Sequence, residues 1–139
     1  MKLIKKEFDG SPEGIVKMIK EKAGDFNFIV REVFDMAEEF RHHDIEVDDG
    51  FVYYSIMLCN PEKAYQSISM IPVRGAMLLP PKQVVVYNEN GKTIIAYVKQ
   101  EERDVASLFP EDHGFQKGLS KSCDNIEELI KGVVVDGKI

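Results

Sequence analysis

Two β-branched runs near the middle of the chain, and the short segment between them, constrain the fold most strongly. The runs at residues 83–87 and 93–98 are separated by Asn88-Glu89-Asn90-Gly91-Lys92. An Asn-Gly pair suits a two-residue turn between antiparallel strands, because both residues tolerate positive φ. We therefore expect a β-hairpin here, and with it an antiparallel sheet.

Two other segments have the pattern of capped helices. Ser11-Pro12-Glu13 and Asn60-Pro61-Glu62 each place a capping side chain before a proline and an acidic residue, which is typical of a helix start. The first helix is expected to end at Gly24 in a left-handed conformation. The second helix is expected to run to about Met70, with inward-facing side chains at Ala64, Tyr65 and Ile68.

The remaining segments complete an α+β pattern. Strands are expected at residues 2–8, 26–31 and 51–58, and the last of these is apolar on both faces, as in a sheet interior or at a partner subunit. Asp35 is expected to cap a short helix. For the tail we expect a helix at 101–109, a loop at 112–120, a short helix from about residue 122, and an edge strand at 133–135. The prediction is a single domain, residues 1–139, folded as a two-layer sandwich of a mostly antiparallel sheet against helices.

Size and charge exclude several classes of protein. A chain of 139 residues, 44% hydrophobic, can bury a core without metal or disulfide staples. Its 18 basic and 24 acidic residues give a net charge of −6, which argues against nucleic acid as the partner. No apolar run approaches the roughly 20 residues of a membrane span, and the charged start is unlike a signal peptide. We therefore expect a cytoplasmic protein with no membrane partner.

Cys59 and Asn60 are the first candidates for a site. The helix dipole and the free N–H groups after Cys59 can lower the pKa of its thiol, giving a redox sensor or a nucleophile. The same helix start can bind an anion. The alternative is structural: a buried cysteine usually acts as a small hydrophobe, and Asn60 is explained by capping. A disulfide to Cys123 is not expected in a chain without an export signal.

A second candidate is the polar stretch that follows the short helix. His42, His43 and Asp44 lie among several acidic residues and could ligate a metal. Their spacing matches neither a helical zinc site nor a calcium loop, and neighbouring histidines usually point apart. A solvated acidic loop is the favoured interpretation.

The segment at residues 70–81 is unusually apolar for a connection between elements. Something must cover it: the protein's own core, a second subunit or an apolar ligand. Self-association is the first choice, because symmetric dimers are the commonest oligomers. Tyr54, Tyr65 and Arg74 could line the same region, although aromatic packing with the hydroxyl towards a partner is the favoured interpretation of the tyrosines.

Several motifs in order resemble one family. Cys59-Asn60-Pro61-Glu62-Lys63-Ala64 is preceded by Tyr54-Ser55-Ile56 and followed by Leu78-Leu79-Pro80, and the strands 28–33 and 84–87 also fit. Over residues 11–98 the chain resembles domain of unknown function 302, with 101–139 as a C-terminal extension.

The resemblance implies a small α+β domain that tends to form homodimers, with no agreed activity and no known cofactor. Members commonly carry a cysteine after Leu-Leu-Pro, where this chain has Pro81. Any thiol-pair or two-cysteine metal role imagined for such a family would therefore lack its second sulfur here.

Three functional hypotheses follow. The first is a homodimeric binding or regulatory module that holds a small anionic or amphipathic ligand near Cys59-Asn60-Pro61. The second is a thiol-dependent redox protein or enzyme that uses Cys59 with His42, His43 or His113. The third is a protein–protein interaction module that binds through residues 70–81. We favour the first, because no arrangement of nucleophile, base and orienting group is evident in the sequence.

Overall fold

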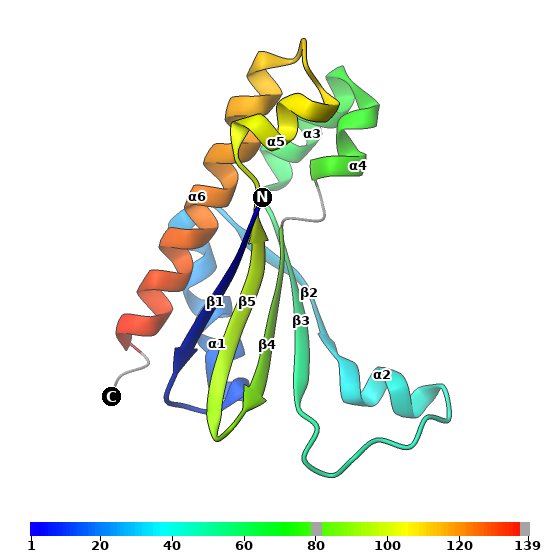
Figure 1. Ribbon diagram of the computed structural model, residues 1–139, viewed down its shortest axis with the longest axis vertical. Coiled ribbons are helices and arrows are strands. Elements are labelled where there is room, and N and C mark those ends of the chain that lie inside the picture. Colours follow the sequence, from blue (N-terminus) through cyan, green and yellow to red (C-terminus); the bar gives the residue numbers. More distant parts are fainter. Residues whose placement is uncertain (79–81, 137–139) are drawn as a thin grey trace.

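The computed structural model describes residues 1–78 and 82–136, and its centre is a five-stranded antiparallel sheet (Figure 1). The strand order is β1-β5-β4-β3-β2. The strands are β1 (Lys2–Phe8), β2 (Ile29–Asp35), β3 (Tyr53–Cys59), β4 (Gln83–Glu89) and β5 (Lys92–Lys99). The predicted hairpin is confirmed as β4 and β5, with φ of 52° at Asn90 and 77° at Gly91.

Helices cover one face of this sheet, as the predicted α+β sandwich requires. The helices are α1 (Pro12–Lys22), α2 (Met36–His42), α3 (Pro61–Met70), α4 (Gly75–Leu78), α5 (Glu102–Leu108) and α6 (His113–Asp136). Alternate side chains of the central strands, such as Ile56, Val84 and Val86, pack against α1 and α6 in the main core. No described helix is long and apolar enough to cross a membrane.

The predicted helix starts are confirmed at both capping residues. The Ser11 hydroxyl accepts a hydrogen bond from the Gly14 N–H at 3.0 Å, and the Asn60 side chain accepts one from the Lys63 N–H at 3.2 Å. The predicted end of the first helix is wrong. A 3₁₀ turn (Ala23–Phe26) follows α1, and Asn27, with φ of 65°, takes the left-handed position expected at Gly24.

The tail differs most from the prediction. One helix of 24 residues, α6, replaces the expected loop at 112–120 and the expected strand at 133–135. Phe115, Leu119 and Ile126 are buried along it at helical spacing, which outweighs the local preference of Gly114 and Gly118 for a loop.

The upper end of the molecule is a helical layer formed by α3, α4, α5 and the first half of α6 (Figure 1). Met77 and Leu78 are buried there in a second cluster with Val105, Phe115 and Leu119. Part of the 70–81 segment is therefore covered by the protein's own core, whereas Met70 and Val73 stay exposed. Of the Leu78-Leu79-Pro80 motif and Pro81, only Leu78 lies within the described residues.

Candidate functional site

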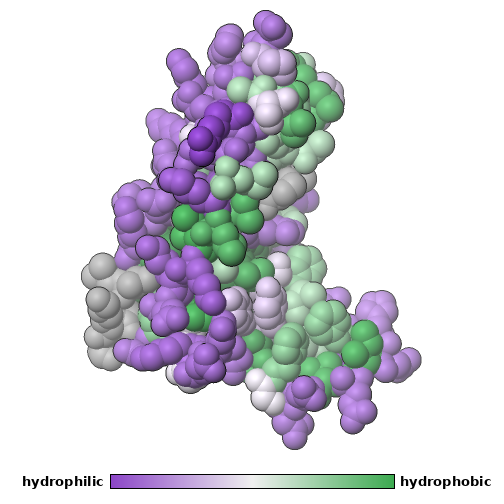
Figure 2. All heavy atoms as spheres, in the orientation of Figure 1, coloured by the Kyte–Doolittle hydropathy of each residue, from purple (hydrophilic) through white to green (hydrophobic). Residues whose placement is uncertain are grey.

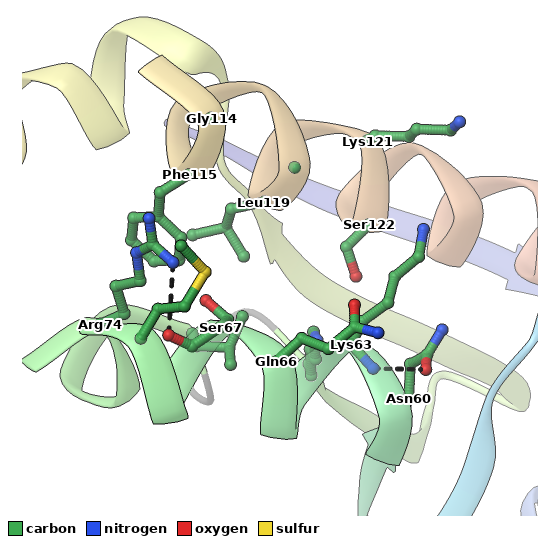
Figure 3. Close-up of a pocket in the computed structure, with 14 residues that line it drawn as sticks. Asn60, Lys63, Gln66, Ser67, Arg74, Gly114, Phe115, Leu119, Lys121 and Ser122 are labelled. Carbon is green, nitrogen blue, oxygen red and sulfur yellow. Dashed lines mark hydrogen bonds between the residues drawn. The ribbon is translucent and has the colours of Figure 1, made fainter. Parts of the chain in front are cut away.

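A pocket of about 420 Å³ lies between α3 and α6 in this helical layer. Its volume is within the range of small-molecule sites. Figure 3 shows Asn60 at one end of the pocket and Arg74 with Phe115 at the other. The lining residues are Asn60, Lys63, Gln66, Ser67, Met70, Arg74, Leu78, Lys82, Gly114, Phe115, Gly118, Leu119, Lys121 and Ser122.

The charged side chains that line this pocket are all basic. Lys63, Arg74, Lys82 and Lys121 line it, and no Asp or Glu appears among its described lining residues. The whole chain carries a net charge of −6, so this basic lining is a local exception. Apolar walls from Leu78, Phe115 and Leu119 complete a surface suited to an anion with an apolar part.

Lys82 has the most unusual environment in the pocket. It precedes β4 and lies next to the end of β3, since Met57 pairs with Gln83. Only 3% of its surface is exposed, and it is the only buried lysine among the described residues. Among the described residues, none accepts a hydrogen bond from the Lys82 ammonium, and no carboxylate forms an ion pair with it. Burial, with a smaller contribution from Lys63, lowers the pKa of the Lys82 amine below its ordinary value.

Arg74 differs from Lys82 because its charge is already satisfied. Its Nε and Nη2 each donate to the Asp112 carboxylate at 2.8 Å, and its Nη1 donates to the Ser67 carbonyl at 3.3 Å. Asp112 also accepts from the Phe115 N–H at the start of α6. The Arg74 hydrogen bonds lower the pKa of the Asp112 carboxyl. The pair therefore joins the two walls of the pocket.

Two free thiols lie near the Lys82 amine. Cys59 and Cys123 are buried, and both interact electrostatically with Lys82. Burial raises the pKa of the Cys123 thiol, although the Gln100 N–H donates to its sulfur. The Cys123 thiol therefore stays protonated at neutral pH and supplies no negative charge to Lys82.

The predicted ligand residues do not gather at one place. Asn60 and Arg74 line the pocket, and Cys59 is absent from the lining but interacts electrostatically with Lys82. Tyr54 is at the other end of β3, where its hydroxyl donates to Glu13 at 3.3 Å. Tyr65 is 74% exposed on α3, contrary to the expectation that it faces inward. A tyrosine in a helix pattern does not by itself indicate which way the helix faces the core.

His42, His43 and Asp44 are exposed and lie at or beyond the end of α2. Since Ile29 pairs with Cys59 and β2 runs away from it to Asp35, α2 begins at the opposite end of the sheet from Cys59. The described residues contain no group of three or more His, Cys, Asp or Glu side chains arranged to hold a metal. These histidines are therefore remote from Cys59.

Sequence reasoning missed Lys82, Lys121, Phe115 and Ser122. Lys82 directly follows the Leu-Leu-Pro-Pro run and directly precedes the hairpin strand, and a lysine inside an apolar stretch was the available signal. The α6 residues were missed because residues 112–120 were expected to form a loop.

The model of the family described as domain of unknown function DUF302 matches residues 4–134. The chain belongs to the DUF302 family. The match is wider than the motif-bearing stretch at 11–98 and includes most of α6. A DUF302 structure, the crystal structure of an uncharacterized conserved protein from Bacillus stearothermophilus, is similar in fold, with a TM-score of 0.69 and 18% identity over 99% of each chain. No curated protein matches this DUF302 chain.

Proposed function

We propose that this DUF302 protein is a binding module for a small anionic, amphipathic molecule, held in the pocket between α3 and α6. The observation that carries the proposal is that the buried residue Lys82 lines the pocket and has no carboxylate or hydrogen-bond partner among the described residues. A buried charge without a partner is costly, so a ligand anion beside it recovers free energy on binding.

The rest of the pocket suits such a ligand. Lys63 adds positive charge, and Phe115 and Leu119 offer apolar contact for a short chain or ring. The helix start predicted to bind an anion is adjacent, but the Asn60 side chain already caps the Lys63 N–H there. The charge partner in the proposal is therefore Lys82 rather than the helix terminus.

Titration calorimetry with octanoate and with octanol tests this function. We expect octanoate to bind more tightly, and Lys82→Met to weaken octanoate binding about tenfold or more, because a charged hydrogen bond contributes about 1.5–3 kcal/mol. Lys117→Met, an exposed change on α6 outside the lining, is the matched control. Equal affinity for both compounds, or no binding of either, would overturn the proposal.

We further propose that the protein is a homodimer, with the uncovered face of the sheet as its interface. In Figure 1 the strands lie in front of α1. By strand alternation this side carries Val98 of β5, which is 39% exposed, and the half-buried Val85 and Tyr87 of β4. Figure 2 shows hydrophobic atoms gathered over the upper parts of β1 and β5. Five strands of about seven residues present on the order of 500 Å². Two such faces together approach the area of a small stable interface.

Sedimentation velocity tests whether the protein is a dimer. With two variants it also shows which of two candidate surfaces, the sheet face or the 70–81 segment, forms the interface. Val98, 39% exposed, lies on the sheet face, and Val73, 61% exposed, lies in the 70–81 segment. We expect Val98→Lys to shift the protein to monomer and Val73→Lys to leave the dimer intact. The reverse result would place the interface at the 70–81 segment, and a monomeric wild type would exclude the homodimer.

A further inference from the structure

Lys82 combines burial, a place in the pocket lining and, among the described residues, freedom from partners. The residue is 3% exposed and is nevertheless one of those that line the pocket. The other described lysines are exposed or half-buried, and Lys99, for example, is paired with Asp124 and Glu127 at 3.0 Å. Lys82 is therefore chemically distinct from every other described lysine.

The surroundings of Lys82 increase the fraction of its amine that is neutral at a given pH. Burial and the nearby Lys63 lower the pKa of the amine, and only the two thiols oppose this effect. The Cys123 thiol stays protonated, because burial raises its own pKa. A neutral lysine amine is a nucleophile, and desolvation in a hydrophobic pocket is a recognised way to activate one.

We propose that Lys82 forms a reversible imine with a small aldehyde or keto acid that carries an anionic group. This inference rests on the proposed function, since the same pocket holds the ligand. The amine lone pair of Nζ attacks the carbonyl carbon, which gives a carbinolamine. Loss of water then leaves a C=N bond in place of C=O, with the carbonyl oxygen and the two amine hydrogens leaving as that water. No oxidant or reductant is required, and hydrolysis reverses the reaction.

The pocket lining supplies the other groups that such a ligand needs. Lys63 on α3 places positive charge at the pocket, available to the anionic group, whereas the exposed Lys121 side chain on α6 points away from α3 (Figure 3). The Ser122 hydroxyl lies on the α6 wall and can exchange protons with the carbinolamine oxygen. Phe115 and Leu119 of α6 add apolar surface for the carbon atoms of the ligand.

Reductive trapping tests the inference on the full chain. The protein is incubated with glyoxylate, a small anionic aldehyde, and cyanoborohydride, and the modified lysines are identified by peptide mass mapping. We expect a single main adduct at Lys82, formed about tenfold or more faster than at exposed Lys117, since each unit of lowered pKa gives tenfold more neutral amine at a given pH. Octanoate is expected to slow the labelling by competition.

Matched variants and a neutral aldehyde are the controls for the trapping experiment. Lys82→Met should abolish the main adduct, whereas Lys117→Met should leave it. Lys63→Met should slow trapping of glyoxylate more than trapping of propanal, with both rates normalised to those of Nα-acetyl-lysine.

A label spread over exposed lysines, with Lys82 labelled no faster than Lys117, would overturn the imine proposal. If octanoate binding still depended on Lys82 in that case, the binding function would stand without the covalent step. If the wild type bound no octanoate, the binding function itself would fail.

Discussion

The Arg74 guanidinium and the Asp112 carboxylate join the two walls of the DUF302 pocket through a pair of 2.8 Å hydrogen bonds. Arg74 follows α3 in the 3₁₀ turn Pro72–Arg74, and Asp112 precedes α6. The guanidinium also lies 5.4 Å from the centre of the Phe115 ring. The pair holds the two walls of the pocket in position and leaves neither partner free to pair with a ligand, because each already has its hydrogen bonds.

Arg74→Met is expected to destabilise the protein by on the order of 2–4 kcal/mol. The variant leaves the Asp112 carboxylate, whose side chain is only 16% exposed, without its main partner. Urea unfolding followed by circular dichroism measures the change. Arg103→Met is the control, since Arg103 is 75% exposed and its contact with Glu101 is 3.6 Å long. Equal effects of the two variants would show that the Arg74–Asp112 pair contributes no more to stability than a surface ion pair.

Local elements of the fold were predictable where a side chain itself favours the backbone conformation that the structure adopts. Asn90-Gly91 specified the hairpin turn, and Ser11 and Asn60 specified helix starts. The long helix α6 was not predictable in the same way, because Gly114 and Gly118 favour a loop and only tertiary packing of Phe115 and Leu119 overrides them.

The candidate site was predictable only in part, for a related reason. Asn60 and Arg74 were identified as candidates and do line the pocket. The pocket itself requires α3 and α6 to lie side by side, and these helices are distant in the sequence. Lys82 becomes unusual only when that packing buries its amine, so its role depends on contacts that no local pattern specifies.

Lys82→Met is expected to stabilise the protein near neutral pH by on the order of 1 kcal/mol or more, because it removes a buried amine without a partner. The folded-state pKa of Lys82 lies below the unfolded value near 10.5, so the unfolded state binds more protons between these two values. The penalty in the wild type is therefore complete below the folded pKa and declines as the pH rises towards 10.5.

Urea unfolding of both proteins across this pH range measures the difference between them. We expect the advantage of Lys82→Met to shrink as the pH rises. The groups that face Lys82 are Lys63 on α3, Cys59 on β3 and Cys123 on α6, and they are present in both proteins. An advantage that stays constant with pH would mean that it comes from packing rather than from the charge.

Tyr97→Phe is expected to change stability by less than about 1 kcal/mol. The Tyr97 hydroxyl is buried and has no hydrogen-bond partner among the described residues, so its removal breaks no bond. Burial, followed by the nearby Glu127, raises the pKa of Tyr97 to about 12. Urea unfolding gives the free energy, and spectrophotometric titration should show that the variant lacks a tyrosine that ionises near pH 12 in the wild type. A loss of several kcal/mol would reveal a partner for the hydroxyl, such as an ordered water.

Gly118→Leu is expected to raise the free energy of unfolding and to weaken ligand binding. Gly118 lines the pocket on α6, and a Cβ added there meets nothing within 4 Å, so a side chain would occupy open space. Replacing a glycine inside a helix stabilises it by roughly 0.5–1 kcal/mol. The leucine side chain would fill the space that the octanoate chain needs, and binding should fall while the unfolding free energy rises.

Gly118→Ala provides the graded control, because it gives the same gain in helix propensity with a single methyl group. We expect calorimetry to show octanoate affinity decreasing from glycine to alanine to leucine, while urea unfolding shows both variants at least as stable as the wild type. If Gly118→Leu bound octanoate as tightly as the wild type, the apolar part of the ligand would have to lie elsewhere. The proposed position of the ligand between α3 and α6 would then be wrong, even if Lys82 still mattered for binding.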